Sequence, residues 1–127
     1  MAKHKEEKTN VMRTLDQKKI PYTAHTYDPD GPIDGVSVAA ALGQDPAHVF
    51  KTLVTKGASG GYYVFDIPVA ENLDLKKAAR AVPTVFHATA PQYDTVCVSA
   101  GKIGAQVECR PGDLIALLRA KTADIIV

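Results

Sequence analysis

The clearest run of apolar and β-branched residues extends from Val49 to Thr55, and one lysine, Lys51, interrupts it. Asp45-Pro46 precedes the run and the glycine-rich segment 57–61 follows it, so the pattern predicts a strand with defined ends. An ammonium group is costly to bury without a partner. Lys51 therefore either points to water at a strand end or edge, or lines a cleft that receives an anion or a carbonyl oxygen.

The hydrophobic periodicity of the remaining chain predicts further helices and strands. Helices are expected at 9–19, 36–42, 75–82 and 111–119, a helical turn at Asp45-Pro46, and strands at 22–27, 62–69, 84–87, 95–99, 105–109 and 122–127. The strands at 49–55 and 62–69 should form a hairpin, and Leu114, Leu117 and Leu118 should face inward from the last helix. Because hairpins and helices are interspersed, we predict a mixed α/β fold whose β-sheet is strongly curved, barrel-like and surrounded by helices.

Polar and thiol side chains within the predicted strands allow two interpretations each. Asp66 either faces solvent from one side of the sheet, which the pattern favours, or faces a site. His25 is more typical of a packing residue than of a catalytic one. Cys97 and Cys109 lie in apolar runs, so we expect two reduced core thiols. The spacing of the cysteines and histidines predicts no metal site.

Composition narrows the function classes. A chain of 127 residues is expected to form one domain with a real core, and its net charge of +1 gives no overall signature of nucleic-acid binding. Lys76, Lys77 and Arg80 on one predicted helix either form a solvated face or meet phosphates.

No run is long and apolar enough to cross a membrane, and residues 1–8 do not resemble a signal peptide. We therefore expect a cytoplasmic protein.

Catalytic signatures are sparse. The chain has no Gly-x-Ser-x-Gly elbow, no P-loop and no dinucleotide fingerprint. The turn 101–104 is too short to define a phosphate loop, although its backbone amides could bind an anion or an oxyanion. The residues alone therefore indicate an α/β domain with a lysine-lined cleft.

Several segments, in order along nearly the whole chain, resemble the YbaK/EbsC family of free-standing Cys-tRNA(Pro) deacylases. That family is related to the editing domain of prolyl-tRNA synthetase. The most specific parts are Phe50-Lys51-Thr52 and Leu73-Asp74-Leu75-Lys76-Lys77. The other parts are His25-Thr26-Tyr27, Asp34-Gly35-Val36, Ala41-Leu42-Gly43, Tyr63-Val64-Phe65, Ile67-Pro68-Val69 and Val98-Ser99-Ala100-Gly101-Lys102 with Gly104.

The resemblance implies the YbaK/prolyl-tRNA synthetase-associated domain fold and aminoacyl-tRNA editing in trans, with Cys-tRNA(Pro) as substrate. A pocket that fits proline discriminates against similar small side chains by only about 10- to 200-fold, so a second site that removes the wrong amino acid restores fidelity. The resemblance implies no cofactor, no metal and no protein nucleophile, because the thiol of the substrate attacks the ester carbonyl and cyclises. The implied partners are the aminoacylated 3′ end of tRNA and prolyl-tRNA synthetase.

Residue roles follow from the same resemblance. Lys51 would hold the 3′-terminal adenosine or the carbonyl oxygen, and Tyr27 would contact the substrate from the first strand. Positioning and charge stabilisation would then supply the rate enhancement. The implied substrate-binding residues are Thr52 and Ser99 through their hydroxyls, and Gly101 and Lys102 through the turn that they form.

Two departures separate this chain from the family pattern. A segment with a glycine-rich loop, Gly-Gly-x-Ser-Pro-x-Gly, is missing between Val82 and Pro83, either because the protein lacks it or because the sequence omits it there; the abrupt joint favours omission. Gln106 stands where the Cys-specific pattern has aspartate, which fits the EbsC side of the family better. The alternative to an enzyme is a degenerate module that binds tRNA or a synthetase, and a generic nucleotide- or anion-binding protein ranks third.

Overall fold

The computed structural model describes residues 8–57, 60–78 and 84–127, so the joint between residues 82 and 83 lies outside the described residues. The helices are α1 (Asn10–Gln17), α2 (Gly35–Ala41), α3 (Leu75–Ala78) and α4 (Pro111–Leu118), with 3-10 turns η1 (Pro46–His48) and η2 (Ala90–Gln92). The strands are β1 (Tyr22–Thr26), β2 (Phe50–Lys56), β3 (Tyr62–Pro68), β4 (Thr84–His87), β5 (Val96–Ser99), β6 (Ala105–Cys109) and β7 (Lys121–Ala123). Each predicted element is present, although β7 ends four residues before the predicted end of the last strand.

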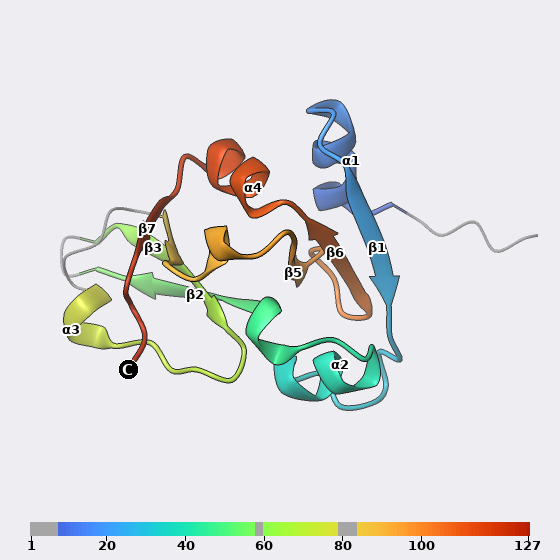
Figure 1. The fold of residues 1–127 in the computed structure, drawn as a ribbon, viewed down its shortest axis with the longest axis horizontal. Coiled ribbons are helices and arrows are strands. Elements are labelled where there is room, and N and C mark those ends of the chain that lie inside the picture. The colour runs from blue at the N-terminus through green and yellow to red at the C-terminus, as the bar shows by residue number, and fades with distance from the viewer. Residues whose placement is uncertain (1–7, 58–59, 79–83) are drawn as a thin grey trace, which may run out of the picture.

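The strands form two sheets. Sheet A has the order β1-β6-β5 and is antiparallel throughout. Sheet B has the order β2-β3-β4-β7, in which the predicted β2–β3 hairpin is antiparallel and the two remaining pairs are parallel. The mixed α/β class is therefore confirmed. In Figure 1, β1 and β6 lie side by side at the right, and the β2–β3 hairpin extends to the left above α2.

Among the described residues, the two sheets share one backbone bridge, between Val49 and Cys97, where the two segments run parallel. The sequence predicted one strongly curved, barrel-like sheet, whereas the described strands form two sheets that do not close into a barrel. Beyond the bridge, β2 and β5 diverge around a cavity that both strands line.

Two main apolar clusters hold the sheets in place. The larger one joins sheet A to α1, α4 and sheet B, and includes Leu15, Val107, Leu114 and the ring pair Phe50–Phe86 with centroids 6.4 Å apart. The second covers the other face of sheet B through residues that include Phe65, Ile67, Val85 and Ile125. Such packing is the main source of stability for short elements like these.

The expected inward position of Leu118 is wrong, whereas that of Leu114 is confirmed. Leu114 is buried and Leu117 packs partly against the larger cluster, but Leu118 is 47% exposed. Helix α4 ends at Arg119, which adopts a left-handed conformation with φ 51°. Leu118 therefore lies in the last turn, where the helix leaves the core.

Local contacts fix the helices next to the cavity. The hydroxyl of Thr9 caps α1 by accepting the Met12 N–H at 3.2 Å, and Asp34 caps α2 by accepting the Ser37 N–H at 3.1 Å. A Cβ atom on Gly35 would lie 2.3 Å from Val69 Cγ1, so the start of α2 packs against the end of β3 in a way that only glycine allows.

Candidate functional site

A cavity of about 530 Å³ opens where the two sheets diverge. Its walls come from the end of β1, the start of β2, the β5–β6 turn and α2. The structure brings all six site residues implied by the sequence to this cavity, namely Tyr27, Lys51, Thr52, Ser99, Gly101 and Lys102. Residues that are far apart in the chain therefore converge on one site.

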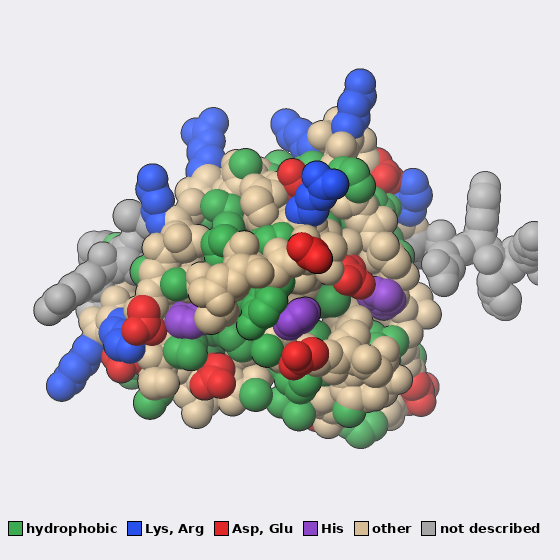
Figure 2. Space-filling view, in the orientation of Figure 1, with side chains coloured by type: hydrophobic (Ala, Val, Ile, Leu, Met, Phe, Trp, Pro, Cys, Tyr) green, Lys and Arg blue, Asp and Glu red, His purple; other side chains and the backbone are tan. Residues whose placement is uncertain are grey.

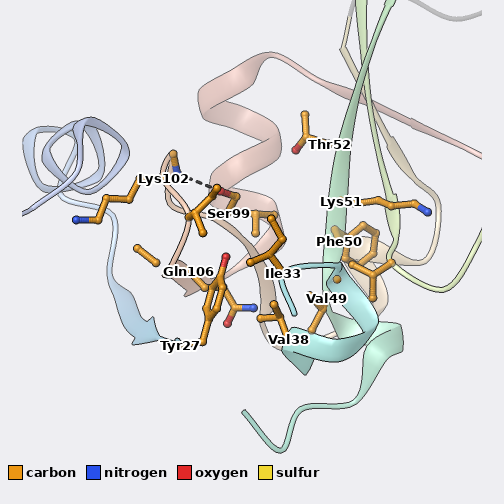
Figure 3. A pocket seen from close by; sticks show the side chains of 16 residues that line it. Tyr27, Ile33, Val38, Val49, Phe50, Lys51, Thr52, Ser99, Lys102 and Gln106 are labelled. Carbon is orange, nitrogen blue, oxygen red and sulfur yellow. Dashed lines mark hydrogen bonds between the residues drawn. The ribbon is translucent and has the colours of Figure 1, made fainter. Parts of the chain in front are cut away.

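The wall from sheet A is held by the turn that follows β5. Gly101 and Gly104 have φ values of 93° and 97°, which favour glycine, and the Tyr27 N–H donates to the Gly104 carbonyl at 3.0 Å. The Gly101 N–H donates to Ser99 Oγ at 3.2 Å, as the dashed line in Figure 3 shows. The Gly101 amide, expected to contact the substrate, thus already has a partner in the protein.

Gln106 forms the floor beside Tyr27, as Figure 3 shows, and is 3% exposed. Its side-chain amide pairs reciprocally with that of Gln44, with N···O distances of 2.7 and 3.1 Å. Sequence reasoning missed Gln44 altogether, because 62 residues separate the two glutamines and no local pattern links them. The floor of the cavity is therefore neutral and has a fixed orientation.

The wall formed by β2 differs from the sheet A wall because it carries the charged side chain of Lys51. Side chains alternate along a strand, so Phe50 and Thr52 share one face and Lys51 belongs to the other. Lys51 is half-buried and lines the cavity, but Figure 3 shows its ammonium group pointing away from Tyr27 and Ser99. No hydrogen bond or ion pair ties Lys51 Nζ to any residue that the structure describes.

The favoured solvent-facing position of Asp66 is wrong, because this carboxyl group is 3% exposed. The Thr52 hydroxyl donates to Asp66 Oδ1 at 2.5 Å. Burial raises the pKa of the Asp66 carboxyl, and the hydrogen bond from Thr52 partly opposes that rise. The face of β3 that was expected to meet water at Asp66 is covered by α1 and α4.

Asp66 lies in a second, mostly apolar cleft of about 400 Å³ between α1, α4 and sheet B. Thr52, Val98 and Ser99 line both this cleft and the cavity. Thr52 thus connects a buried carboxyl group to the site, and its hydroxyl oxygen keeps lone pairs that can accept a hydrogen bond from a ligand.

The charged residues that line the cavity are Lys51 and Lys102, and no described carboxylate lines it. This lining suits phosphate groups and a developing negative charge on oxygen. Ile33, Val38 and Val49 add apolar surface for a small side chain. On the face of the molecule that Figure 2 shows, Lys and Arg side chains lie along the upper edge and at the lower left rather than in one central patch.

The basic cluster predicted for residues 75–82 is in part structural. Lys77 Nζ lies 2.9 Å from both Asp124 Oδ2 and the Ile126 carbonyl, and so fastens α3 to the end of the chain. Lys76 is exposed, and Arg80 lies outside the described residues. Among the described helices, none is long and apolar enough to cross a membrane.

A curated relative aligns with nearly the whole chain. No family model matches the sequence. A curated protein of Enterococcus faecalis, named as a candidate Cys-tRNA(Pro)/Cys-tRNA(Cys) deacylase, EbsC, is 33% identical over 160 aligned positions that cover 98% of both chains. Because this chain has 127 residues, at least 33 of those positions hold a residue of the relative and none of this chain.

Two solved structures have the same fold. A candidate trans-editing enzyme for prolyl tRNA synthetase is 20% identical with a TM-score of 0.76, covering 92% of this chain and 94% of that one. A hypothetical protein is 18% identical with a TM-score of 0.80, covering 92% of this chain and 99% of that one. At these identities the likeness establishes the fold.

Proposed function

The chain belongs to the YbaK/EbsC family, and from that premise we propose that it is an aminoacyl-tRNA deacylase that edits mischarged tRNA in trans. The observation that carries the proposal is the convergence of all six implied site residues on one cavity. The relative named as a Cys-tRNA(Pro)/Cys-tRNA(Cys) deacylase matches over its whole length, which supports the same activity here.

The proposed substrate is Cys-tRNA(Pro), with Cys-tRNA(Cys) or another misacylated tRNA as further substrates. A cavity of about 530 Å³ is in the size range of pockets that bind small organic ligands, and an aminoacyl-adenosine end is such a ligand. The lysines of the lining suit the phosphate backbone, and the apolar lining suits a short side chain.

The proposed chemistry uses the substrate's own thiol and needs neither a metal nor a protein nucleophile. The sulfur forms a bond to the ester carbonyl carbon, the ester C–O bond breaks, and the thiol proton passes to the 3′ oxygen of the tRNA. Lys51 reaches the carbonyl oxygen when its side chain rotates into the cavity, and there stabilises the developing oxyanion. Tyr27, Thr52 and Ser99 orient the ester, and orientation alone supplies a large part of such a rate.

The proposed partners are tRNA and prolyl-tRNA synthetase in the cytoplasm. The 15 Lys and Arg residues are nearly balanced by 14 Asp and Glu residues, so the chain has little net positive charge to attract phosphates, whose contacts set most of the affinity for nucleic acid. We therefore propose that a synthetase partner supplies tRNA affinity and specificity. Tight, salt-insensitive binding of free tRNA by the purified chain would contradict this part.

The test is a deacylation assay on Cys-tRNA(Pro), Cys-tRNA(Cys) and Ala-tRNA(Pro), with and without prolyl-tRNA synthetase. The proposal expects release of cysteine from Cys-tRNA(Pro) faster than spontaneous hydrolysis, and a product analysis separates thiol cyclisation from attack by water. No acceleration on any of the three substrates would overturn the proposed function.

A second candidate, a binding module without turnover, is favoured by the 33 or more aligned positions at which this chain has no residue. The intact mass of the purified protein separates the two candidates. A mass near 13.6 kDa together with no turnover supports the module, whereas a mass several kDa higher shows that the segment exists.

A further inference from the structure

Three side chains with metal-binding atoms meet on one face of sheet A. His25 on β1, Cys97 on β5 and Glu108 on β6 place one ligand atom each within 4.8 Å of the others. The strand register explains the meeting, because Cys97 lies opposite Glu108, and Glu108 lies opposite Thr23, two residues from His25 on the same face. None of the three lines the cavity of the candidate site.

We propose that His25, Cys97 and Glu108 form a zinc-binding site that is separate from the proposed deacylation site. An imidazole nitrogen, a thiolate and a carboxylate are the ligand types that Zn²⁺ takes in proteins. Three protein ligands leave a fourth position for water, and the half-buried side chains of His25 and Glu108 leave the site open to solvent on one side.

The hydrogen bonds around Glu108 prepare it as a ligand. Thr95 Oγ1 donates to Glu108 Oε2 at 2.5 Å, and His25 Nε2 lies 2.8 Å from Glu108 Oε1. Thr95 thus fixes the orientation of the Glu108 carboxyl group from outside the ligand set, as outer-shell partners do in metal sites.

The distances need only a small adjustment. Ligand atoms around a tetrahedral zinc ion lie about 3.4 Å apart, since each Zn–N or Zn–O bond is about 2.0–2.2 Å. The His25–Glu108 pair at 2.8 Å would open by roughly 0.6 Å as the metal replaces the shared proton, and the thiol would move inward. The Cys97 thiol is buried, and burial raises its pKa to about 12, so the metal must also displace the thiol proton.

Cys109 provides a matched comparison within the same sheet. It is also a free, buried cysteine, although it lies on the central strand β6 and Cys97 on the edge strand β5, and burial raises its pKa to about 11. It belongs to the larger apolar cluster and not to the His25–Glu108 group. The two thiols therefore differ mainly in their neighbours, and a variant of Cys109 reports what loss of a buried thiol does without loss of a ligand.

The experiment is a Zn²⁺ titration of tag-free, chelator-treated protein against a chromophoric competitor, with Co²⁺ absorption as a second readout. Wild type and Cys109→Ser should bind one Zn²⁺ per chain, and the Co²⁺ form should show a thiolate charge-transfer band. Cys97→Ser and His25→Ala should weaken binding by more than about 100-fold, since loss of an outer-shell partner alone costs about 10–100-fold. Thr95→Val should weaken Zn²⁺ binding by about 10- to 100-fold, the range for loss of an outer-shell partner.

Two results would overturn the proposal: no stoichiometric Zn²⁺ binding by the wild type, or equal affinities for wild type and Cys97→Ser. If Cys97→Ser is unfolded by circular dichroism, Glu108→Gln decides, because it keeps the shape of the side chain and removes the ligand charge. Metal binding is measured without tRNA, so failure here and failure of the deacylation assay are distinguishable.

Discussion

The two walls of the cavity differ in how their polar groups are satisfied. On the sheet A wall, Ser99 and Gln106 are tied to partners within the protein. On the β2 wall, Lys51 contacts no described partner and turns its ammonium group away. Apart from the exposed Lys102 in its turn, the sheet A wall therefore has a fixed shape, whereas the β2 wall carries the half-buried charge of Lys51, so shape and charge should respond to different substitutions.

The largest effect should come from Lys51→Ala, which removes the ammonium group from the β2 wall of the cavity. We expect deacylation to fall by about 100- to 1,000-fold, as for loss of one oxyanion donor, with the free energy of unfolding changed by less than about 0.5 kcal/mol. Single-turnover kinetics on Cys-tRNA(Pro) and urea unfolding measure the two quantities.

Lys56→Ala is the control for that variant, because Lys56 is an exposed lysine at the far end of the same strand. It should keep wild-type rates. Equal rates for Lys51→Ala and Lys56→Ala would remove the functional contrast between the two walls.

Gln44→Ala should lower the free energy of unfolding through its effect on the sheet A wall. It leaves the buried amide of Gln106 without its partner, and an unpaired buried polar group costs about 1–3 kcal/mol of unfolding free energy. Urea unfolding measures the loss. The double variant Gln44→Leu/Gln106→Leu should recover much of it, because replacing both partners with apolar groups leaves neither unpaired. A double variant less stable than Gln44→Ala would show that the pair is not an isolated unit.

Asp66→Asn should stabilise the protein at neutral pH. The pKa of the buried carboxyl is raised above its ordinary value of 3.8, so the folded state holds this proton more tightly than the unfolded state. Asp66 therefore lowers stability as pH rises from 3.8 through its folded pKa, and the gain in the asparagine variant should vanish below 3.8. Urea unfolding over a pH series measures it, and a gain independent of pH would contradict this account.

Ser99→Ala should have the smallest effect. The variant loses the acceptor for the Gly101 N–H, but the turn is exposed and water can replace the hydroxyl. We expect a loss of unfolding free energy below about 1 kcal/mol and a several-fold slower deacylation. A rate as low as that of Lys51→Ala would mean that Ser99 stabilises the developing oxyanion and does more than orient the ester.

The elements of this fold were predictable because their signals are local. The β2–β3 hairpin and the Asp45-Pro46 turn each depend on a few neighbouring residues, and both are present. The cavity residues came from the family resemblance, and the structure places them together.

What could not be predicted depends on contacts between distant segments. The pairing of Gln44 with Gln106 and the meeting of His25, Cys97 and Glu108 need the strand register, which no single segment encodes. The burial of Asp66 depends on which helices cover its face of β3. The direction of the Lys51 side chain is a choice of rotamer within a strand, and periodicity does not specify it.

The lone bridge between Val49 and Cys97 has a kinetic consequence. The larger apolar cluster also joins the two sheets, so the backbone amides beside the cavity, rather than the sheets as wholes, should open to exchange as two separate local units. A ligand that contacts both walls would join these units and slow exchange in β2 and β5 together. Protection that spreads across both strands on binding would thus report occupancy of the cavity without any chemical step.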